Sequence, residues 1–434
     1  MNKAVLKSLF VENFASFAER TGFTTEIDGS KKDSFDNTFI SGGTRINRVS
    51  LIYGANGAGK TFFCKALLEI QRILNLSPIL ASPSASKILS TPQFKELAGP
   101  VPSFAFDTSY RDRPTTLGLD IVLSDTTFHY EFSVQGNTIT HELLTKRQRR
   151  TQKLLERMSP SFEDISLHSE MKSFESFKSS VRPDALCLSM AAVLNNPLAK
   201  QLFDAILKIK VENMAAGHLN PPESETAFSE ERIEKYLEIL KRADGTLRGL
   251  NVSSSEEEVA RQKVGSGDFE NREIISKRLT VSVESDHVVY NDGQEQNVKA
   301  PINFFADESL GTIKLFTLLP CLYDVLEDGG IFFMDELENG LHLSLAKEIV
   351  NLFNNEKTNP FDAQLICTSH QPLLLDGDFR RDQVWIVMKD KLGKSEMHRL
   401  SEQKTAHAKV KLTTQILQGA FGCNPEKFFD NHTL

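Results

Sequence analysis

Short apolar runs alternate with amphipathic stretches at both ends of the chain, a pattern typical of an α/β domain. Residues 4–17 have the pattern of a strand that leads into a turn, and residues 49–53 are mostly apolar, as buried parallel strands are. A helix is predicted over 62–74, where apolar positions recur at helical spacing. After residue 300 the alternation returns, with strands predicted at 330–334, 364–368 and 384–388 and helices at 313–319 and 337–353.

The middle of the chain has a different pattern. Residues 103–145 alternate apolar and polar positions between turn residues, which predicts an antiparallel meander. Residues 146–280 are rich in Lys, Glu and Ser and favour helices, with an acidic loop expected at 253–258. We therefore predict one α/β domain that an insertion of roughly 200 residues splits into two parts. The predicted segments are 1–100 (first part of the α/β domain), 101–145 (meander), 146–285 (mainly helical insertion) and 286–434 (second part of the α/β domain).

Composition and charge narrow the class of protein. The chain has 434 residues, 40% of them hydrophobic, and its 58 acidic and 50 basic residues leave a net charge of −8. This composition excludes a mainly disordered chain, and a general nucleic-acid coat protein would need a strongly basic face. The five cysteines lie far apart without metal-ligand spacing, which favours a reducing compartment. No apolar run approaches the ~18 residues that span a membrane, so we expect a soluble cytoplasmic protein.

A glycine-rich segment after the strand at 49–53 is the strongest chemical signal in the chain. Residues 54–61, Gly-Ala-Asn-Gly-Ala-Gly-Lys-Thr, match the phosphate-binding pattern GxxxxGK[ST] between a strand and a helix. Backbone N–H groups of such a loop bind phosphate, while Lys60 reaches the β- and γ-phosphates and Thr61 binds Mg²⁺. The motif predicts a site for ATP and Mg²⁺, with the binding residues Asn56, Gly57, Ala58, Gly59, Lys60 and Thr61.

The second signal is a pair of adjacent carboxylates after an apolar run. Residues 330–336, Gly-Ile-Phe-Phe-Met-Asp-Glu, fit a buried strand whose carboxyl end carries charge to the edge where ligands bind. Alone, this pattern commonly marks only the end of a strand. Together with the phosphate-binding loop, it predicts that Asp335 holds Mg²⁺ and that Glu336 orients or deprotonates the attacking water.

Two further segments decide the subclass. His370 follows the strand at 364–368, where an imidazole could contact the γ-phosphate; the alternative is an ordinary loop histidine. The predicted catalytic residues are thus Lys60, Glu336 and His370. Ser309 and Gly311 stand at the start of the helix predicted at 313–319, which is the helix that precedes the carboxylate strand. A serine at a helix start is normally only an N-cap.

The order of these motifs resembles that of ABC-type ATPases shared with DNA-repair and chromosome-maintenance proteins. In that class, a Ser-x-Gly helix start contacts the nucleotide of the partner subunit. Finer stretches resemble a bacterial group of stand-alone ABC ATPases from phage-defence operons, especially the ATPase subunits of PARIS anti-phage systems. These stretches are 11–17, 186–192, 308–312, 336–342 and 418–425.

The resemblance implies an ABC-type P-loop ATPase whose slow, regulatory ATP hydrolysis controls another protein. A complete site would require at least a homodimer, because each chain supplies one phosphate-binding loop and one Ser309–Gly311 element. The PARIS resemblance further implies a larger assembly, such as a hexamer, that holds a Toprim-family nuclease until a phage-encoded trigger protein is sensed.

Several features leave alternatives open. Residues 308–312 have the sequence ESLGT in place of the usual LSGGQ-like motif. No glutamine, Gln93 included, can be assigned as a Q-loop residue. His342 could act across a dimer or cap a helix. The basic cluster at 146–150 could contact nucleic acid, contact an acidic protein, or be a solvated face. The alternative functions are a DNA-repair or recombination ATPase acting on DNA ends, which the acidic balance disfavours, and an adaptor that binds ATP without turnover.

Overall fold

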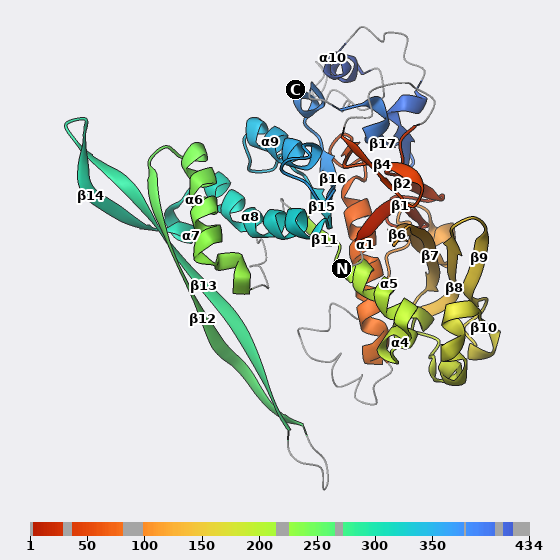
Figure 1. Ribbon diagram of the computed structural model, residues 1–434. Helices are drawn as coiled ribbons and strands as arrows, with labels where there is room; N and C mark the ends of the chain where they lie inside the picture. The colour runs from red at the N-terminus through yellow and green to blue at the C-terminus, as the bar shows by residue number, and fades with distance from the viewer. Residues whose placement is uncertain are drawn as a thin grey trace. The chain divides into compact units, whose positions relative to one another are not determined.

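The computed structural model divides the chain into two compact units, residues 1–215 with 325–434 and residues 216–324. The structure describes residues 3–28, 37–80, 99–213, 225–264, 272–376, 379–403 and 411–419. Each unit is described by itself. The first unit thus combines both ends of the chain, which Figure 1 colours red and blue.

A six-stranded sheet, parallel except at one edge, forms the centre of the first unit. Its order is β11-β15-β16-β5-β17-β18, and only β18 is antiparallel to its neighbour. Every residue of β5, β15 and β16 is buried, which explains their nearly continuous apolar sequences. The strands are β5 (Val49–Tyr53), β11 (Lys210–Asn213), β15 (Ile331–Asp335), β16 (Gln364–Ser369), β17 (Val384–Lys389) and β18 (Ser395–Arg399).

A seven-stranded antiparallel sheet forms the second layer of this unit, in the order β10-β9-β8-β7-β6-β1-β2. Its strands are β1 (Ala4–Glu12), β2 (Thr21–Thr24), β6 (Thr115–Leu123), β7 (Thr126–Gln135), β8 (Thr138–Arg147), β9 (Thr151–Arg157) and β10 (Ile165–Leu167). The antiparallel pairing of β6, β7 and β8 agrees with the meander expected from the sequence. The meander does not end at residue 145, however, because β9 and β10 extend it.

Helix α1 (Thr61–Leu80) packs against strands of both sheets, including β1, β6 and β15. Its buried side chains Phe63, Leu67 and Ile70 belong to the same apolar core as residues of β1 and β15. Helices α4 (Cys187–Val193) and α5 (Pro197–Leu207) pack on α1 (Figure 1). The unit also contains a hairpin of β3 (Thr38–Ser41) and β4 (Thr44–Asn47), and the helices α9 (Leu343–Asn354) and α10 (Leu412–Leu417).

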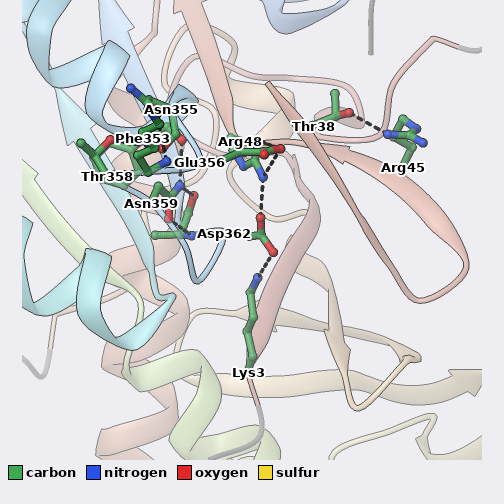
Figure 2. A network of polar contacts seen from close by, with 12 residues as sticks. Lys3, Thr38, Arg45, Arg48, Phe353, Asn355, Glu356, Thr358, Asn359 and Asp362 are labelled. Carbon is green, nitrogen blue, oxygen red and sulfur yellow. Dashed lines mark hydrogen bonds and ion pairs between the residues drawn. The ribbon is translucent and has the colours of Figure 1, made fainter. Parts of the chain in front are cut away.

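Polar contacts join the start of β16 to the second layer. The Gln364 side chain accepts from Leu6 N at 2.7 Å and donates to Leu6 O at 2.9 Å, so it pairs with β1 as a strand would. Figure 2 shows the neighbouring ion pairs, in which Asp362 lies 2.7 Å from Arg48 and 3.3 Å from Lys3. Asn359 donates to the carbonyls of Phe353 and Ala363 and closes the loop after α9. These contacts position β16, which leads to His370.

The second unit combines helices with a long antiparallel ribbon. Its elements are α6 (Glu230–Ala243), β12 (Leu247–Val264), β13 (Arg272–Asn291), β14 (Gln294–Asn303), α7 (Phe304–Asp307) and the part of α8 (Leu310–Asp328) up to Asp324. Aromatic side chains pack its helices together: the Phe316 ring lies 4.8 Å from that of Phe304 and 6.4 Å from that of Tyr236. Strand β14 pairs only with the Glu284–Asn291 part of β13, so β12 and β13 continue as a two-stranded ribbon.

Residues 146–280 are therefore only partly helical. Helices α4, α5 and α6 lie there as expected, but residues 253–258, expected to form an acidic loop, belong to β12. The composition of this stretch suits an exposed helix as well as an exposed strand, and strand pairing between distant residues decides between them. The helix expected at 337–353 begins later, at Leu343, because residues 336–340 form a turn.

Short 3₁₀ helices connect the other elements: η1 (Thr108–Tyr110), η2 (Phe162–Asp164), η3 (Ser169–Ser180), η5 (Glu225–Phe228), η6 (Pro372–Asp376), η7 (Arg381–Gln383) and η8 (Leu400–Glu402). Among the helices that the structure describes, none has the length and apolar character needed to cross a membrane.

Candidate functional site

The phosphate-binding loop lies between β5 and α1, as its sequence predicts. Gly57 and Gly59 have positive φ angles of 77° and 115°, which favour glycine. A Cβ on Gly59 would lie 2.6 Å from Ser395 Oγ and 2.8 Å from Ser16 Oγ, so only glycine fits there. Ser395 Oγ also donates to Ala58 O at 2.6 Å. Residues from β18 and from the segment after β1 thus hold the loop in shape, and they leave Asn56 and Gly57 exposed.

Lys60 is held inside this loop. Its side chain is buried, with the residue 5% exposed, and Nζ donates to Gly54 O at 2.8 Å and Ala55 O at 2.9 Å. Burial lowers the pKa of Lys60, while the carboxylates of Glu338, Glu336 and Asp335 oppose the shift. The cation therefore lies within reach of both the loop and the acidic strand end, as binding of β- and γ-phosphates requires.

Asp335 ends β15 and is 1% exposed. Thr368, on the neighbouring β16, donates from Oγ1 to Asp335 Oδ1 at 2.6 Å, and the same hydroxyl accepts from Glu336 N at 2.8 Å. Burial raises the pKa of Asp335, and hydrogen bonds from Thr368 and Thr61 oppose the shift. The two predicted Mg²⁺ ligands, Thr61 and Asp335, are therefore in contact.

Glu336 has a strained backbone, with a φ of 55° in the left-handed region that non-glycine residues seldom adopt. Asn339 Nδ2 donates to Glu336 Oε2 at 2.8 Å, which holds the carboxylate in place. Such strain at a strand end persists where the surroundings enforce it, and it clusters at functional sites. A carboxylate beside Lys60 and Asp335 can orient or deprotonate a water molecule.

Glu338 is a site residue that the sequence analysis missed. Its Oε1 accepts from His370 N at 2.7 Å and lies 3.0 Å from His370 Nδ1, so it holds both the backbone and the ring of the histidine predicted to contact the γ-phosphate. The Glu338 side chain is 9% exposed, and its Oε2 is buried without a hydrogen-bond partner among the described residues. The sequence signal that could have identified Glu338 is its position two residues after Glu336. It lies within residues 336–342, which were considered only for their resemblance to the phage-defence ATPases.

Lys60, Thr61, Asp335, Glu336 and His370 thus belong to one unit, whereas Ser309 and Gly311 belong to the other. Ser309 precedes α8, and its Oγ accepts from Thr312 N at 3.1 Å, which is an N-cap interaction. His342 is likewise the N-cap of α9, because its side chain accepts from Ser344 N. Gln93 lies outside the described residues.

The basic cluster lies at the turn between β8 and β9. Lys146 forms an ion pair with Glu170, which lowers the pKa of that carboxyl group. Arg147, Arg149 and Arg150 are exposed at the turn.

A phosphate-binding loop after β5, and a buried aspartate at the tip of β15 with one strand between them, are the features of a P-loop ATPase with a split α/β fold. Residues 49–376 match the family model described as "AAA domain, putative AbiEii toxin, Type IV TA system". This match covers more than half of the chain, and the chain belongs to that family. Such ATPases bind ATP, typically with Mg²⁺, and the residues around Lys60 and Asp335 fit both.

Among solved structures, the chain is similar to the SMC head domain from Thermotoga maritima. The two are 12% identical with a TM-score of 0.35, over 91% of this chain and 98% of that chain. No curated protein matches the chain.

Thr368→Val tests the geometry of the acidic strand end. The substitution keeps the shape of the side chain but removes the hydroxyl that bonds Asp335 and Glu336 N. Hydrogen bonds to charged groups contribute about 1.5–3 kcal/mol, so we expect ATP turnover to fall about tenfold or more. Steady-state hydrolysis at saturating Mg²⁺ measures this. Ser50→Ala on β5 is the matched control, because Ser50 Oγ is buried without a partner among the described residues. Equal turnover in both variants would contradict the assigned role of Thr368.

Proposed function

We propose that this protein is the ATP-binding and ATP-hydrolysing scaffold or sensor subunit of a bacterial anti-phage defence system, most like AriA of the PARIS system, and that it works in the cytoplasm. The observation that carries the proposal is the joint placement of Lys60, Thr61, Asp335 and Glu336 in one unit. Membership of a family described by an abortive-infection toxin and a toxin–antitoxin system supports the defence role. Slow hydrolysis would serve as a switch.

Self-association would complete the nucleotide site. The N-cap Ser309 is exposed, and the apolar side chains beside it, Leu310 and Phe305, are 59% and 44% exposed. Exposed apolar residues around a polar group favour a contact surface for another protein. We propose that Ser309 and Gly311 of one copy face the phosphate-binding loop of another, in at least a dimer and, by resemblance to PARIS, in a hexamer.

The proposed partners are a Toprim-family nuclease effector and a phage-encoded trigger protein. The most suitable contact region lies within residues 146–280, which include β12, the first part of β13 and the exposed arginines at the β8–β9 turn. Coupling requires the affinity for the effector to differ between nucleotide states. The arginine turn is also the one observation that favours the alternative, a DNA-repair or recombination ATPase acting on DNA ends.

Two substitutions separate ATP binding from hydrolysis. Lys60→Ala should abolish ATP binding, because the β- and γ-phosphate charges lose their cation. Glu336→Gln should keep ATP binding but slow turnover, because the water loses its base while the geometry remains. Nucleotide binding by calorimetry and turnover by phosphate release are the measurements. If Glu336→Gln hydrolyses ATP at the parental rate, Glu336 is not the base.

Mixing two inactive variants tests the composite site. Ser309→Arg should block the contact that Ser309 makes, and Lys60→Ala should empty its own phosphate-binding loop. A mixed pair still contains one intact loop opposite one intact Ser309, so we expect hydrolysis to return in the mixture. Titrating one variant against the other while measuring phosphate release shows this. A mixture no more active than either variant alone means that the site is completed within one chain.

Co-purification tests the effector. We expect the purified chain to capture the protein encoded beside it in its operon, with an affinity that differs with and without ATP. Reversing the charge of Arg147, Arg149 and Arg150 shows whether the basic turn recognises an acidic trigger. If the neighbour never co-purifies and the chain binds duplex DNA ends tightly in the presence of ATP, the DNA-repair function replaces the one proposed here.

A further inference from the structure

Glu308, the residue before Ser309, is bonded into the sheet of the second unit. Its side chain is 5% exposed, and its Oε1 accepts from Ser285 Oγ at 2.6 Å and lies 2.6 Å from His287 Nε2. His287 Nδ1 lies 2.9 Å from Thr246 Oγ1, whose hydroxyl donates to Asp244 Oδ1 at 2.7 Å. A continuous chain of hydrogen bonds therefore runs from the loop before β12, through β13, to the start of α8.

The hydrogen bonds in this chain have a defined direction. Thr246 donates its only hydroxyl proton to Asp244, so its oxygen accepts from His287 Nδ1–H. The contact between His287 Nε2 and Glu308 Oε1, at 2.6 Å, then completes the chain of hydrogen bonds. Because Ser285, His287 and the Glu308 side chain are buried and hydrogen-bonded, this part of the network is rigid.

The network lies in the three-stranded part of the β12–β14 sheet. His287 is opposite Leu247 of β12 and Ala300 of β14, so it lies where β13 has a neighbour on both sides. Ser285 lies two residues earlier, on the same face of β13. Displacement of the ribbon would therefore be transmitted to the Glu308 carboxylate.

Glu308 also determines where Ser309 points. Glu308 and Ser309 are the two residues between α7 and α8, and Glu308 is extended, with a φ of −75° and a ψ of 161°. Successive side chains of an extended backbone point in opposite directions, so a buried Glu308 turns Ser309 outward. Ser309 is indeed exposed. A leucine at this position, as in the LSGGQ-like text, would have no oxygen to bond His287 and Ser285.

We propose that Glu308, held by His287 and Ser285, is a positioning residue that presents Ser309 to the nucleotide of a second copy and couples the β12–β14 sheet to that site. This inference rests on the proposed function, because it requires Ser309 to act in trans. It explains why the segment 308–312 begins with glutamate.

The decisive variants are Glu308→Ala and His287→Ala. Each keeps its own phosphate-binding loop, so the KM for ATP should stay within about twofold while kcat falls about tenfold or more. Glu308→Gln keeps an oxygen that can accept from Ser285 and adds an amide that can bond His287, so it should lose less activity than Glu308→Ala. Glu295→Gln is the matched control, because Glu295 lies on β14 with a side chain 54% exposed and outside the network. It should behave as the parent.

Mixing separates positioning from damage to the fold. Glu308→Ala mixed with Lys60→Ala should recover hydrolysis to the level of the Ser309→Arg and Lys60→Ala mixture, because the second chain supplies an intact Ser309 element. If Glu308→Ala has the parental kcat while Ser309→Arg is inactive, this inference is wrong and the composite site still stands. The same holds if no mixture restores hydrolysis to the Glu308→Ala chain. If the Ser309→Arg and Lys60→Ala mixture itself stays inactive, the composite site of the proposed function is wrong, and this inference falls with it.

Discussion

The nucleotide site depends on one strand, β16, lying in parallel register between β5 and β15. This order brings the phosphate-binding loop and the acidic strand end to the same edge of the sheet, because the carboxyl ends of parallel strands coincide. Thr368 then bonds Asp335 with its proton and the Glu336 backbone with its oxygen. A single hydroxyl on the middle strand thereby holds the Asp335 carboxylate and the backbone of Glu336, two residues with different expected tasks. Gln364, at the other end of β16, ties the same strand to β1.

Burial gives this site its chemical character. Lys60 and Asp335 have pKa values shifted by burial in opposite directions, so the surroundings oppose the charge of each. Lys60 is meanwhile bonded to two loop carbonyls, and Glu338 has one oxygen without a partner among the described residues. A phosphate with its metal ion would supply the missing counter-charges. The site is thus arranged in advance for a charged ligand, which is how enzymes stabilise developing charge with little reorganisation.

The sequence was sufficient for the parts of this site that rest on local pattern. The loop at 54–61, the strand that ends at Asp335 and the strand before His370 each have their own apolar run and turn, and the structure has them at those positions. Contacts between distant residues could not be predicted. Glu338 meets His370 only because β15 and β16 are neighbours, and no periodicity signals that pairing. The β12–β13 ribbon was hidden for the same reason, since its Ser, Glu and Lys content suits a solvated helix and only the pairing of Leu247 with His287 and of Val264 with Arg272 makes it a strand pair.

The division into two units has a consequence for how nucleotide could be sensed. The predicted γ-phosphate contact, His370, is held by Glu338 in the first unit, while Ser309 is held through Glu308 in the second. In the first case the glutamate bonds the functional histidine directly, and in the second the glutamate adjoins the functional serine and bonds His287. Helix α8 begins beside Ser309 and ends three residues before β15, and Pro320 within it cannot donate a backbone hydrogen bond. The chain therefore runs from the element that begins at Ser309, through one helix, directly to the strand that ends at Asp335.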